Sequence, residues 1–139
     1  MVQTRLCIVT NVYFPQVGGI QKVASEQIRQ LIHRNYEHFV VRNRIHTPKN
    51  YVFDGVRVEC HDSLNIGFRL GIPYTIPSAA SLKTFLKAAK SSDIIHAQGH
   101  PYLTSLIMGK LAKRYSKPFV ITQHNTFIDY DNIFNKLER

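Results

Sequence analysis

The chain has 139 residues, a length that suits one domain of ordinary size. Hydrophobic residues make up 44% of it, which is enough to fill a core and argues against a disordered chain. Lysine and arginine total 18 against 9 acidic residues, so the formal net charge is +9. This excess favours polyanionic partners, namely nucleic acid, phosphorylated small molecules or an anionic membrane surface, and does not choose among them.

The first predicted elements are a strand and a helix. Residues 6–9 form a continuous apolar run, the pattern of a parallel strand covered on both faces. A glycine-bearing turn, YFPQVGG, leads into a helix that ends at Asn35, a residue that tolerates the left-handed conformation of a helix stop. The apolar stripe of this helix contains Ile20, Val23, Ala24, Ile28, Leu31 and Ile32.

The middle of the chain predicts two strands, a long loop and a helix. The strands are 38–41 and the alternating segment 56–60, which follows an Asp54-Gly55 turn. Residues 61–77, with glycines, prolines and scattered apolar side chains, read as a loop. Ser78 or Ser81 can cap the next helix. The side chains that this helix is expected to point inward are Leu82, Phe85, Leu86 and Ala89.

The last segments continue the alternation. Residues 93–97 and 118–122 are short apolar runs that predict buried strands. Between them, Pro101 suits the first turn of a helix that reaches Tyr115, and residues 130–139 begin a further helix. The two cysteines, Cys7 and Cys60, lie in strand-like apolar segments, so we expect reduced packing residues and no disulfide.

Strands that alternate with helices predict an α/β fold: a doubly wound, mostly parallel sheet with helices on both faces. We expect a single domain over residues 1–139, incomplete at its carboxyl end because the sequence stops soon after a helix begins. The amino-terminal apolar run is too short for a signal peptide, and no segment approaches the length of a transmembrane helix. The sequence therefore favours a cytoplasmic protein, with peripheral membrane contact as an option.

Polar clusters follow three of the predicted strands. In open α/β sheets, ligands bind beyond the carboxyl ends of the strands, so these clusters are expected at one edge. Their members are Asn11, Tyr13, Gly18 and Gly19 after the first strand, Gln98, Gly99 and His100 after the fourth, and Gln123, His124, Asn125 and Thr126 after the fifth.

Gly18 and Gly19 stand just before a predicted helix. Two glycines there let the backbone approach a phosphate or a sugar oxygen, and the helix amino terminus supplies free N–H groups. The alternative is a tight turn that merely needs positive φ angles. The pattern is neither a G-x-G-x-x-G fingerprint nor a P-loop.

His124 can donate a hydrogen bond to a phosphate or a sugar hydroxyl, and its polar neighbours Asn125 and Thr126 favour that interpretation. The alternative is a histidine held by loop backbone. His96 lies inside a predicted strand and is expected to be a hydrogen-bonded core residue. For His100, at an expected helix start, capping competes with ligand contact.

Lysines and arginines cluster on the two helices of the second half. The usual interpretation of such a cluster is a helix face that points into solvent. Attraction to anionic lipid is the alternative, assisted by the apolar loop residues. We do not expect nucleic-acid binding, because no helix carries a base-reading pattern and no strand pairs aromatic with basic residues. The basic positions are Lys83, Lys87, Lys90, Lys110, Lys113, Arg114 and Lys117, and the apolar ones are Ile66, Phe68, Leu70, Ile72 and Tyr74.

Three segments together resemble family 4 glycosyltransferases, which have the GT-B architecture of two facing Rossmann-like domains. They are IVTNVYFPQVGGIQKVASEQIRQL, DIIHAQGHP and PFVITQHNT, in the order that the family shows. The likeness covers nearly the whole chain and places it in the amino-terminal domain. The first motif is fairly specific, and the other two carry weight only together.

The resemblance implies transfer of a sugar from a nucleotide diphosphate sugar, with retention at the anomeric carbon and without a bound metal or other cofactor. Gly18 and Gly19 match the loop against the donor diphosphate and the acceptor, and Gln21 matches an acceptor-facing position. Tyr13 and His100 are further expected acceptor contacts. His124 matches the histidine near the reaction centre, which makes it the expected catalytic residue, with Asn125 and Thr126 in support.

Two departures from the family pattern bear on function. Gln98 stands where relatives often have a second histidine, which weakens a role at that position. The carboxyl-terminal, nucleotide-binding domain is not in this sequence, and that domain is expected to supply most nucleotide contacts and the groups that stabilise the leaving diphosphate. We therefore expect no turnover from the chain alone, and partnership with that domain in cis or in trans.

Two other hypotheses stay open, the weaker of which is a basic nucleic-acid binder. The chain can be a non-enzymatic Rossmann-like module that binds a phosphorylated ligand or a protein partner. Self-association is a further expectation, because an unfinished domain leaves a sheet edge or an apolar face uncovered. Neither the donor sugar nor the acceptor can be named from the sequence.

Overall fold

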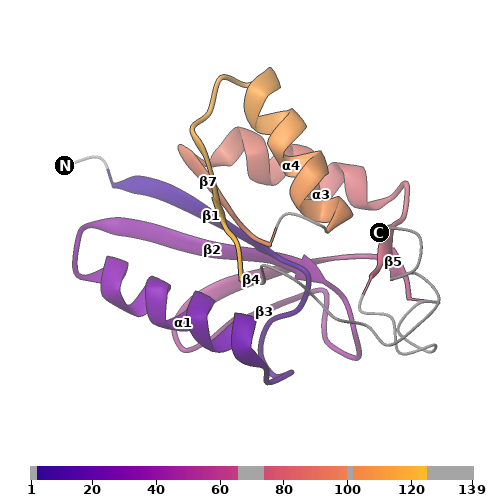
Figure 1. Ribbon diagram of the computed structural model, residues 1–139, viewed down its shortest axis with the longest axis horizontal. Coiled ribbons are helices and arrows are strands. Elements are labelled where there is room, and N and C mark those ends of the chain that lie inside the picture. Colours follow the sequence, from indigo (N-terminus) through magenta and orange to yellow (C-terminus); the bar gives the residue numbers. More distant parts are fainter. Residues whose placement is uncertain (1–2, 66–73, 100–101, 125–139) are drawn as a thin grey trace, which may run out of the picture.

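The computed structural model describes residues 3–65, 74–99 and 102–124. Its main sheet has six strands in the order β3-β4-β2-β1-β7-β8 (Figure 1). All neighbours pair in parallel except β3, which is antiparallel to β4. The strands of this sheet are β1 (Thr4–Thr10), β2 (Tyr36–Asn43), β3 (Asn50–Phe53), β4 (Val56–His61), β7 (Ile94–Gln98) and β8 (Phe119–Thr122). The helices are α1 (Gly19–Ile32), α3 (Ser81–Ser91) and α4 (Leu103–Arg114).

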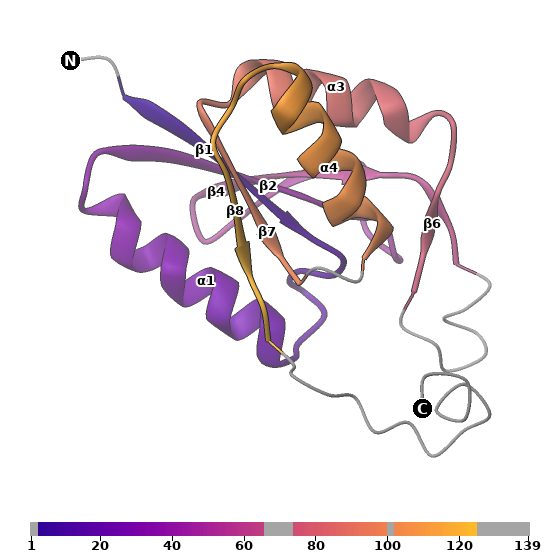
Figure 2. The same ribbon diagram turned by 45° about the horizontal axis from the view of Figure 1, so that its top comes forward.

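Helices cover both faces of the sheet, as the sequence predicts. Figure 2 shows α1 on one face and α3 with α4 on the other. The apolar run of β1 is buried from both sides, with Leu6 at 4% and Cys7 and Ile8 at 0% exposure. Alternate residues of that run enter different cores: Ile8 packs with Ile28 of α1, whereas Cys7 packs with Phe85 of α3. The α/β class and the doubly wound, mostly parallel sheet are therefore confirmed.

Two predicted turns form with the expected chemistry. Asn35 adopts the left-handed conformation, with a φ of 64°, but α1 already ends at Ile32, with His33 as its C-cap, so Asn35 reverses the chain between α1 and β2. Asp54 and Gly55, with φ of 50° and 77°, connect β3 to β4 as a hairpin. Strand β3 itself was not predicted from the sequence, because its four residues NYVF give too short a pattern to stand out.

The expected loop over 61–77 holds more structure than predicted. Its described residues include the two-stranded antiparallel pair of β5 (Ser63–Leu64) and β6 (Ile76–Pro77). The predicted serine cap of α3 is wrong: the N-cap residue is Ala80, and no side chain caps the helix. Ser81 instead donates its hydroxyl to the carbonyl of Asp62 and thereby ties α3 to the end of β4.

Two burial predictions are also wrong. Leu82 is 51% exposed, and the buried residues of α3 are Ser81, Phe85, Ala88 and Ala89. In β8, Val120 and Ile121 are 48% and 44% exposed, because β8 is the edge strand of the sheet within the described residues. The predictions at Pro101 and over residues 130–139 lie outside the described residues.

Cys7 and Cys60 are both buried and unpaired, as expected. Burial raises the pKa of each thiol above its ordinary value, which keeps both protonated at neutral pH. No helix in the described part of the chain is long and apolar enough to cross a bilayer.

Candidate functional site

The strand order creates a topological switch point beside β1. The chain passes from β1 to β2 and β4 on one side and then returns to β7 and β8 on the other side. Figure 2 shows that β1, β7 and β8 end at one edge of the sheet, next to the first turn of α1. This edge is the place where ligands bind in doubly wound folds.

The two glycines at the start of α1 are not explained by backbone conformation. Gly18 is the N-cap with a φ of −166° and ψ of 179°, which any residue can adopt. Among the described glycines only Gly55 and Gly99 have positive φ. The tight-turn alternative for Gly18 and Gly19 is therefore wrong.

Packing does not require a glycine at either position, because a side chain at Gly18 would meet only the movable end of Gln21 and one at Gly19 would meet nothing within 4 Å. A Cβ atom at Gly18 would lie 2.6 Å from Oε1 of Gln21, the end of a flexible side chain. A Cβ atom at Gly19 would have no neighbour within 4 Å. Gly19 thus keeps open space above the first turn of α1, where N–H groups without a helical partner point outward.

A chain of amide and imidazole hydrogen bonds holds His124 at the same edge. Nε2 of His124 lies 2.7 Å from Oε1 of Gln98, and Nε2 of Gln98 donates to Oε1 of Gln27 at 2.7 Å. Gln98 is fully buried at the end of β7, and Gln27 lies near the middle of α1. The chain of hydrogen bonds therefore connects three parts of the fold: α1, β7 and the residues after β8.

Both histidines near Gln98 favour the neutral form. Burial lowers the pKa of His124 below its ordinary value. His96 is 9% exposed, and burial, assisted by the nearby His124, lowers its pKa as well. Nε2 of His96 lies 2.7 Å from Oγ1 of Thr122. His96 is thus the hydrogen-bonded core residue that the sequence predicts.

The turn after β7 is closed by its own hydrogen bonds. Gly99 has a φ of 88°, a conformation that favours glycine, and its N–H donates to the carbonyl of Thr122 at 2.8 Å. Ser105 in the first turn of α4 donates its hydroxyl to the carbonyl of Gly99 at 2.6 Å. Gly99 is therefore held by a backbone hydrogen bond and by a hydrogen bond from a serine side chain, neither of which involves His124.

A buried arginine at the end of β2 shapes the loop that leads to the glycines. Arg42 is 0% exposed, and its guanidinium donates to the carbonyl of Tyr13 and to Oε1 of Gln16, each at 2.7 Å. Tyr13, which we expected among the acceptor contacts, is 1% exposed and packs in the core beneath α1. The role of Tyr13 as an acceptor contact stays a prediction. Arg42, which the sequence pattern did not single out, holds the loop that contains Tyr13 through these hydrogen bonds.

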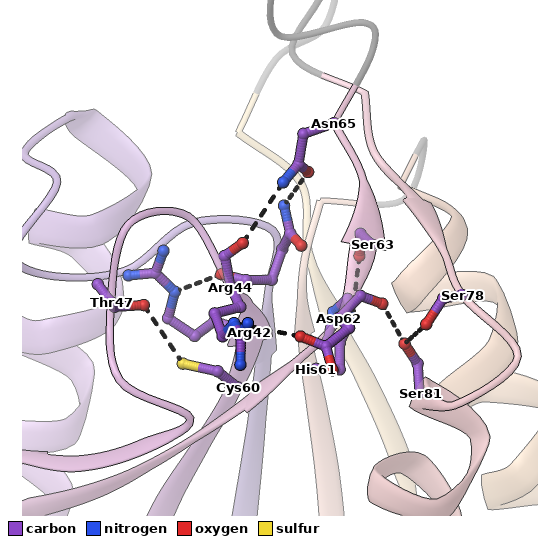
Figure 3. Close-up of polar contacts among 11 residues, drawn as sticks. Arg42, Arg44, Thr47, Cys60, His61, Asp62, Ser63, Asn65, Ser78 and Ser81 are labelled. Carbon is purple, nitrogen blue, oxygen red and sulfur yellow. Dashed lines mark hydrogen bonds and ion pairs between the residues drawn. The ribbon is translucent and has the colours of Figure 1, made fainter.

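The next part of the edge, at the ends of β2 and β4, is a polar network in which some groups are paired, whereas the buried atoms Nη2 of Arg42, Oδ1 of Asn43 and Nε2 of His61 have no hydrogen-bond partner among the described residues (Figure 3). Arg44 pairs with Asp62 at 3.2 Å, and Nδ2 of Asn43 donates to Oδ1 of Asn65 at 2.9 Å. Within this network His61 is 1% exposed, and burial lowers its pKa to about 4. Arg44 and Asp62 form an ion pair with each other in this network.

The remaining predicted site residues fall into two groups. Gln21 lies in the first turn of α1, half-buried, beside Gly18. His100, Asn125 and Thr126 lie outside the described residues. Within the residues that the structure describes, no three His, Cys, Asp or Glu side chains gather closely enough to hold a metal ion.

The role of Gln98 differs more between the sequence and the structure than that of any other predicted site residue. The sequence pattern marks this glutamine as a weakened site position, whereas the structure puts its amide between α1 and His124. Gln27 was missed altogether, because a glutamine on the flank of an apolar helix stripe resembles a solvated residue. Only its contact with the end of β7 identifies it.

Fold and site together define a Rossmann-like α/β domain whose carboxyl edge carries a glycine turn, a buried amide and a neutral imidazole. The family model described as Glycosyltransferase Family 4 matches residues 17–139. The chain therefore belongs to glycosyltransferase family 4. No curated protein matches it.

Proposed function

We propose that this chain is the acceptor-side domain of a retaining glycosyltransferase, which transfers a hexosyl group from a nucleotide diphosphate sugar to an acceptor. In this proposal the open turn at Gly18 and Gly19 lies against the donor diphosphate and the acceptor, with Gln21 beside the acceptor. His124 contacts the donor sugar near the reacting carbon and is the catalytic residue. His100, Asn125 and Thr126 remain proposed contacts from their positions in the sequence.

The observation that carries the proposal is the open space at Gly19. Neither its φ angle nor any neighbour within 4 Å requires a glycine there. A ligand that approaches the backbone is a physical reason for the missing side chain. The hydrogen bond between Gln98 and His124 holds an imidazole at the same edge of the sheet.

The described edge supports the expectation that this domain needs a partner domain. Arg42 is buried against loop carbonyls, and Arg44 is paired with the carboxylate of Asp62, so the positive charge of these two arginines is enclosed or partly neutralised at this edge. Electrostatic stabilisation of the charge that develops in the transition state usually contributes more to catalysis than any other effect. We propose that a carboxyl-terminal nucleotide-binding domain supplies it in cis or in trans, without a metal ion, and that the reaction occurs in the cytoplasm.

The test is release of nucleoside diphosphate from a panel of nucleotide sugars, with the chain alone and with a family carboxyl-terminal domain fused to it. We expect no release from the chain alone and release from the fusion, with the anomeric configuration of the product retained by NMR. A fusion that transfers nothing from any donor, while the chain still binds a phosphorylated ligand, would favour the non-enzymatic module.

Two variants locate the site within the fusion. Gly19→Val should lower transfer at least about a hundredfold through lost close approach and leave the thermal midpoint nearly unchanged, because its side chain meets open space. His124→Ala should lower turnover with little effect on stability. His33→Ala, an exposed histidine at the other end of α1, is the matched control. Equal effects of the two histidine variants would remove His124 from the site.

A further inference from the structure

One end of the α3–α4 layer exposes an unusual share of large apolar side chains. Half of the large apolar residues that the structure describes as exposed belong to this end, which we call the apolar end. Its members are Leu64, Tyr74, Ile76, Leu82, Leu103 and Leu106. Scattered exposed leucines need no explanation, but a concentration in elements that lie together does.

The elements that carry the apolar end are neighbours in the fold. Leu64 of β5 pairs with Ile76 of β6, and these residues are 55% and 58% exposed. The ring of Tyr74 lies 5.9 Å from that of Tyr102, the N-cap of α4. In both Figures 1 and 2, β5 or β6 and the first turns of α3 and α4 lie at one end of the layer.

The two helices behind the apolar end are basic and carry no acidic residue. Exposed residues along α4 run from Leu103 and Leu106 to Lys110, and along α3 from Leu82 to Lys83. The helices together contain Lys83, Lys87, Lys90, Lys110, Lys113 and Arg114. Of these, only Lys87 has an acidic partner among the described residues, Glu59 at 3.3 Å.

Two of these lysines, Lys83 and Lys110, lie close enough to the apolar end to contact the same surface as its leucines. Lys83 follows Leu82 directly, and Lys110 is one helical turn beyond Leu106, a rise of about 6 Å. This is shorter than the screening length of about 8 Å at physiological salt. A negatively charged surface that contacts the leucines is therefore within electrostatic reach of both ammonium groups.

We propose that the apolar end, with the lysines of α3 and α4, is a docking surface for an anionic lipid bilayer. Leucine, isoleucine and tyrosine enter the headgroup boundary while lysines contact anionic headgroups. A nucleic acid would use the lysines and leave the aliphatic side chains exposed. A second copy of the chain would bring like charges together. This docking surface is independent of the proposed transfer reaction.

The opposite face of the sheet provides the contrast. Helix α1 also exposes an apolar residue and basic residues, with Val23 at 40% exposure. However, its Glu26 pairs with Arg29 at 3.3 Å, and Arg29 also lies 3.8 Å from Asp54. The positive charge on the α1 face is partly neutralised by these acidic residues. Lysine and apolar residues of α1 replaced by glutamate therefore serve as controls for the glutamate substitutions on α3 and α4.

The experiment is co-sedimentation of the chain with vesicles of phosphatidylcholine, with and without phosphatidylserine. We expect binding to the anionic vesicles only, weakened by added salt. The double variant Lys83→Glu with Lys110→Glu should lower the partition coefficient at least about tenfold, since each basic residue near the surface contributes about fivefold. The double variant Leu82→Glu with Leu106→Glu should lower it at least as much.

The control is the double variant Lys22→Glu with Val23→Glu on α1, which should bind within about twofold of the unchanged chain. All substituted side chains are exposed, so urea unfolding of each variant should confirm an intact fold. The proposal is overturned if the chain ignores anionic vesicles or if the α1 variant loses as much binding. The proposal is also overturned if the leucine variant binds vesicles as well as the unchanged chain does. Binding would then depend on charge alone, as it would for a polyanion such as RNA, and no apolar side chain would enter the bilayer.

Discussion

Replacement of Arg42 by methionine tests how the glycine loop is held. Methionine keeps an unbranched side chain of similar length and removes the guanidinium. That group has no carboxylate partner in the described part of the chain, and its shortest contacts, all at 2.7 Å, are to the carbonyls of Asn43 and Tyr13 and to Oε1 of Gln16. Carbonyl dipoles therefore stabilise a fully buried positive charge.

The expected loss can be worked from these three contacts. A hydrogen bond to a charged group contributes about 1.5–3 kcal/mol, so the three together contribute roughly 5–9 kcal/mol. Removing the guanidinium also removes the desolvation penalty of a buried ion, which amounts to several kcal/mol. The net loss in the free energy of unfolding should be about 2–5 kcal/mol, equal to a fall in thermal midpoint of roughly 7–17 °C for a chain of this size.

The assay is urea unfolding followed by circular dichroism, together with amide hydrogen exchange over residues 12–18. Arg42→Met should lose stability and exchange faster in that loop, and Arg42→Lys, which keeps the charge but fewer donors, should fall between it and the unchanged chain. A methionine variant that loses less than about 1 kcal/mol would refute the reasoning. So would unchanged exchange in residues 12–18, because the loop would then be held by something else.

Two further predictions concern the core. Burial lowers the pKa of His61 to about 4, below the value of 6.5 expected in the unfolded chain. The unfolded state therefore binds the proton first, and stability should fall by about 3 kcal/mol as the pH drops from 6.5 to 4, measured by urea unfolding across that range; His61→Leu should flatten this dependence by about that amount. Gly109→Val should lower the free energy of unfolding by about 1–3 kcal/mol, because even a Cβ atom would lie 3.1 Å from the ring of Phe119; a thermal midpoint at or above that of the unchanged chain would contradict the tight contact.

The elements that the sequence predicted well are those with dense, continuous apolar patterns. Residues 6–9 indicate a strand covered on both faces, and the six-residue stripe of α1 indicates a helix that in the structure runs from Gly19 to Ile32, three residues short of Asn35. The run FVIT at 119–122 has the same composition, yet Val120 and Ile121 are exposed. Local composition does not report whether a strand lies at the centre or at the edge of a sheet, because that depends on neighbours distant in sequence.

The candidate site shows the same limit. The carboxyl-edge rule places Gly19 and His124 at one rim from the sequence alone, because parallel strands end on the same side. It could not find Gln27 or assign Gln98, whose partners are 71 and 26 residues away in the sequence. Nor could it indicate that the side chain of Tyr13 is buried in the core that α1 covers, because burial depends on residues distant in sequence.

The side-chain amide of Gln98 has a donor nitrogen and an acceptor oxygen, and its orientation determines which nitrogen of the His124 ring carries hydrogen. Since its nitrogen faces the side-chain oxygen of Gln27, its oxygen must face the imidazole, and an oxygen of this kind only accepts. This arrangement favours the tautomer of residue 124 with hydrogen on Nε2, and in the proposed site Nδ1 is the atom that would meet a ligand as a lone pair. At neutral pH this ring should receive a hydrogen bond from a sugar hydroxyl, and it should donate one to a phosphate oxygen only after gaining a proton.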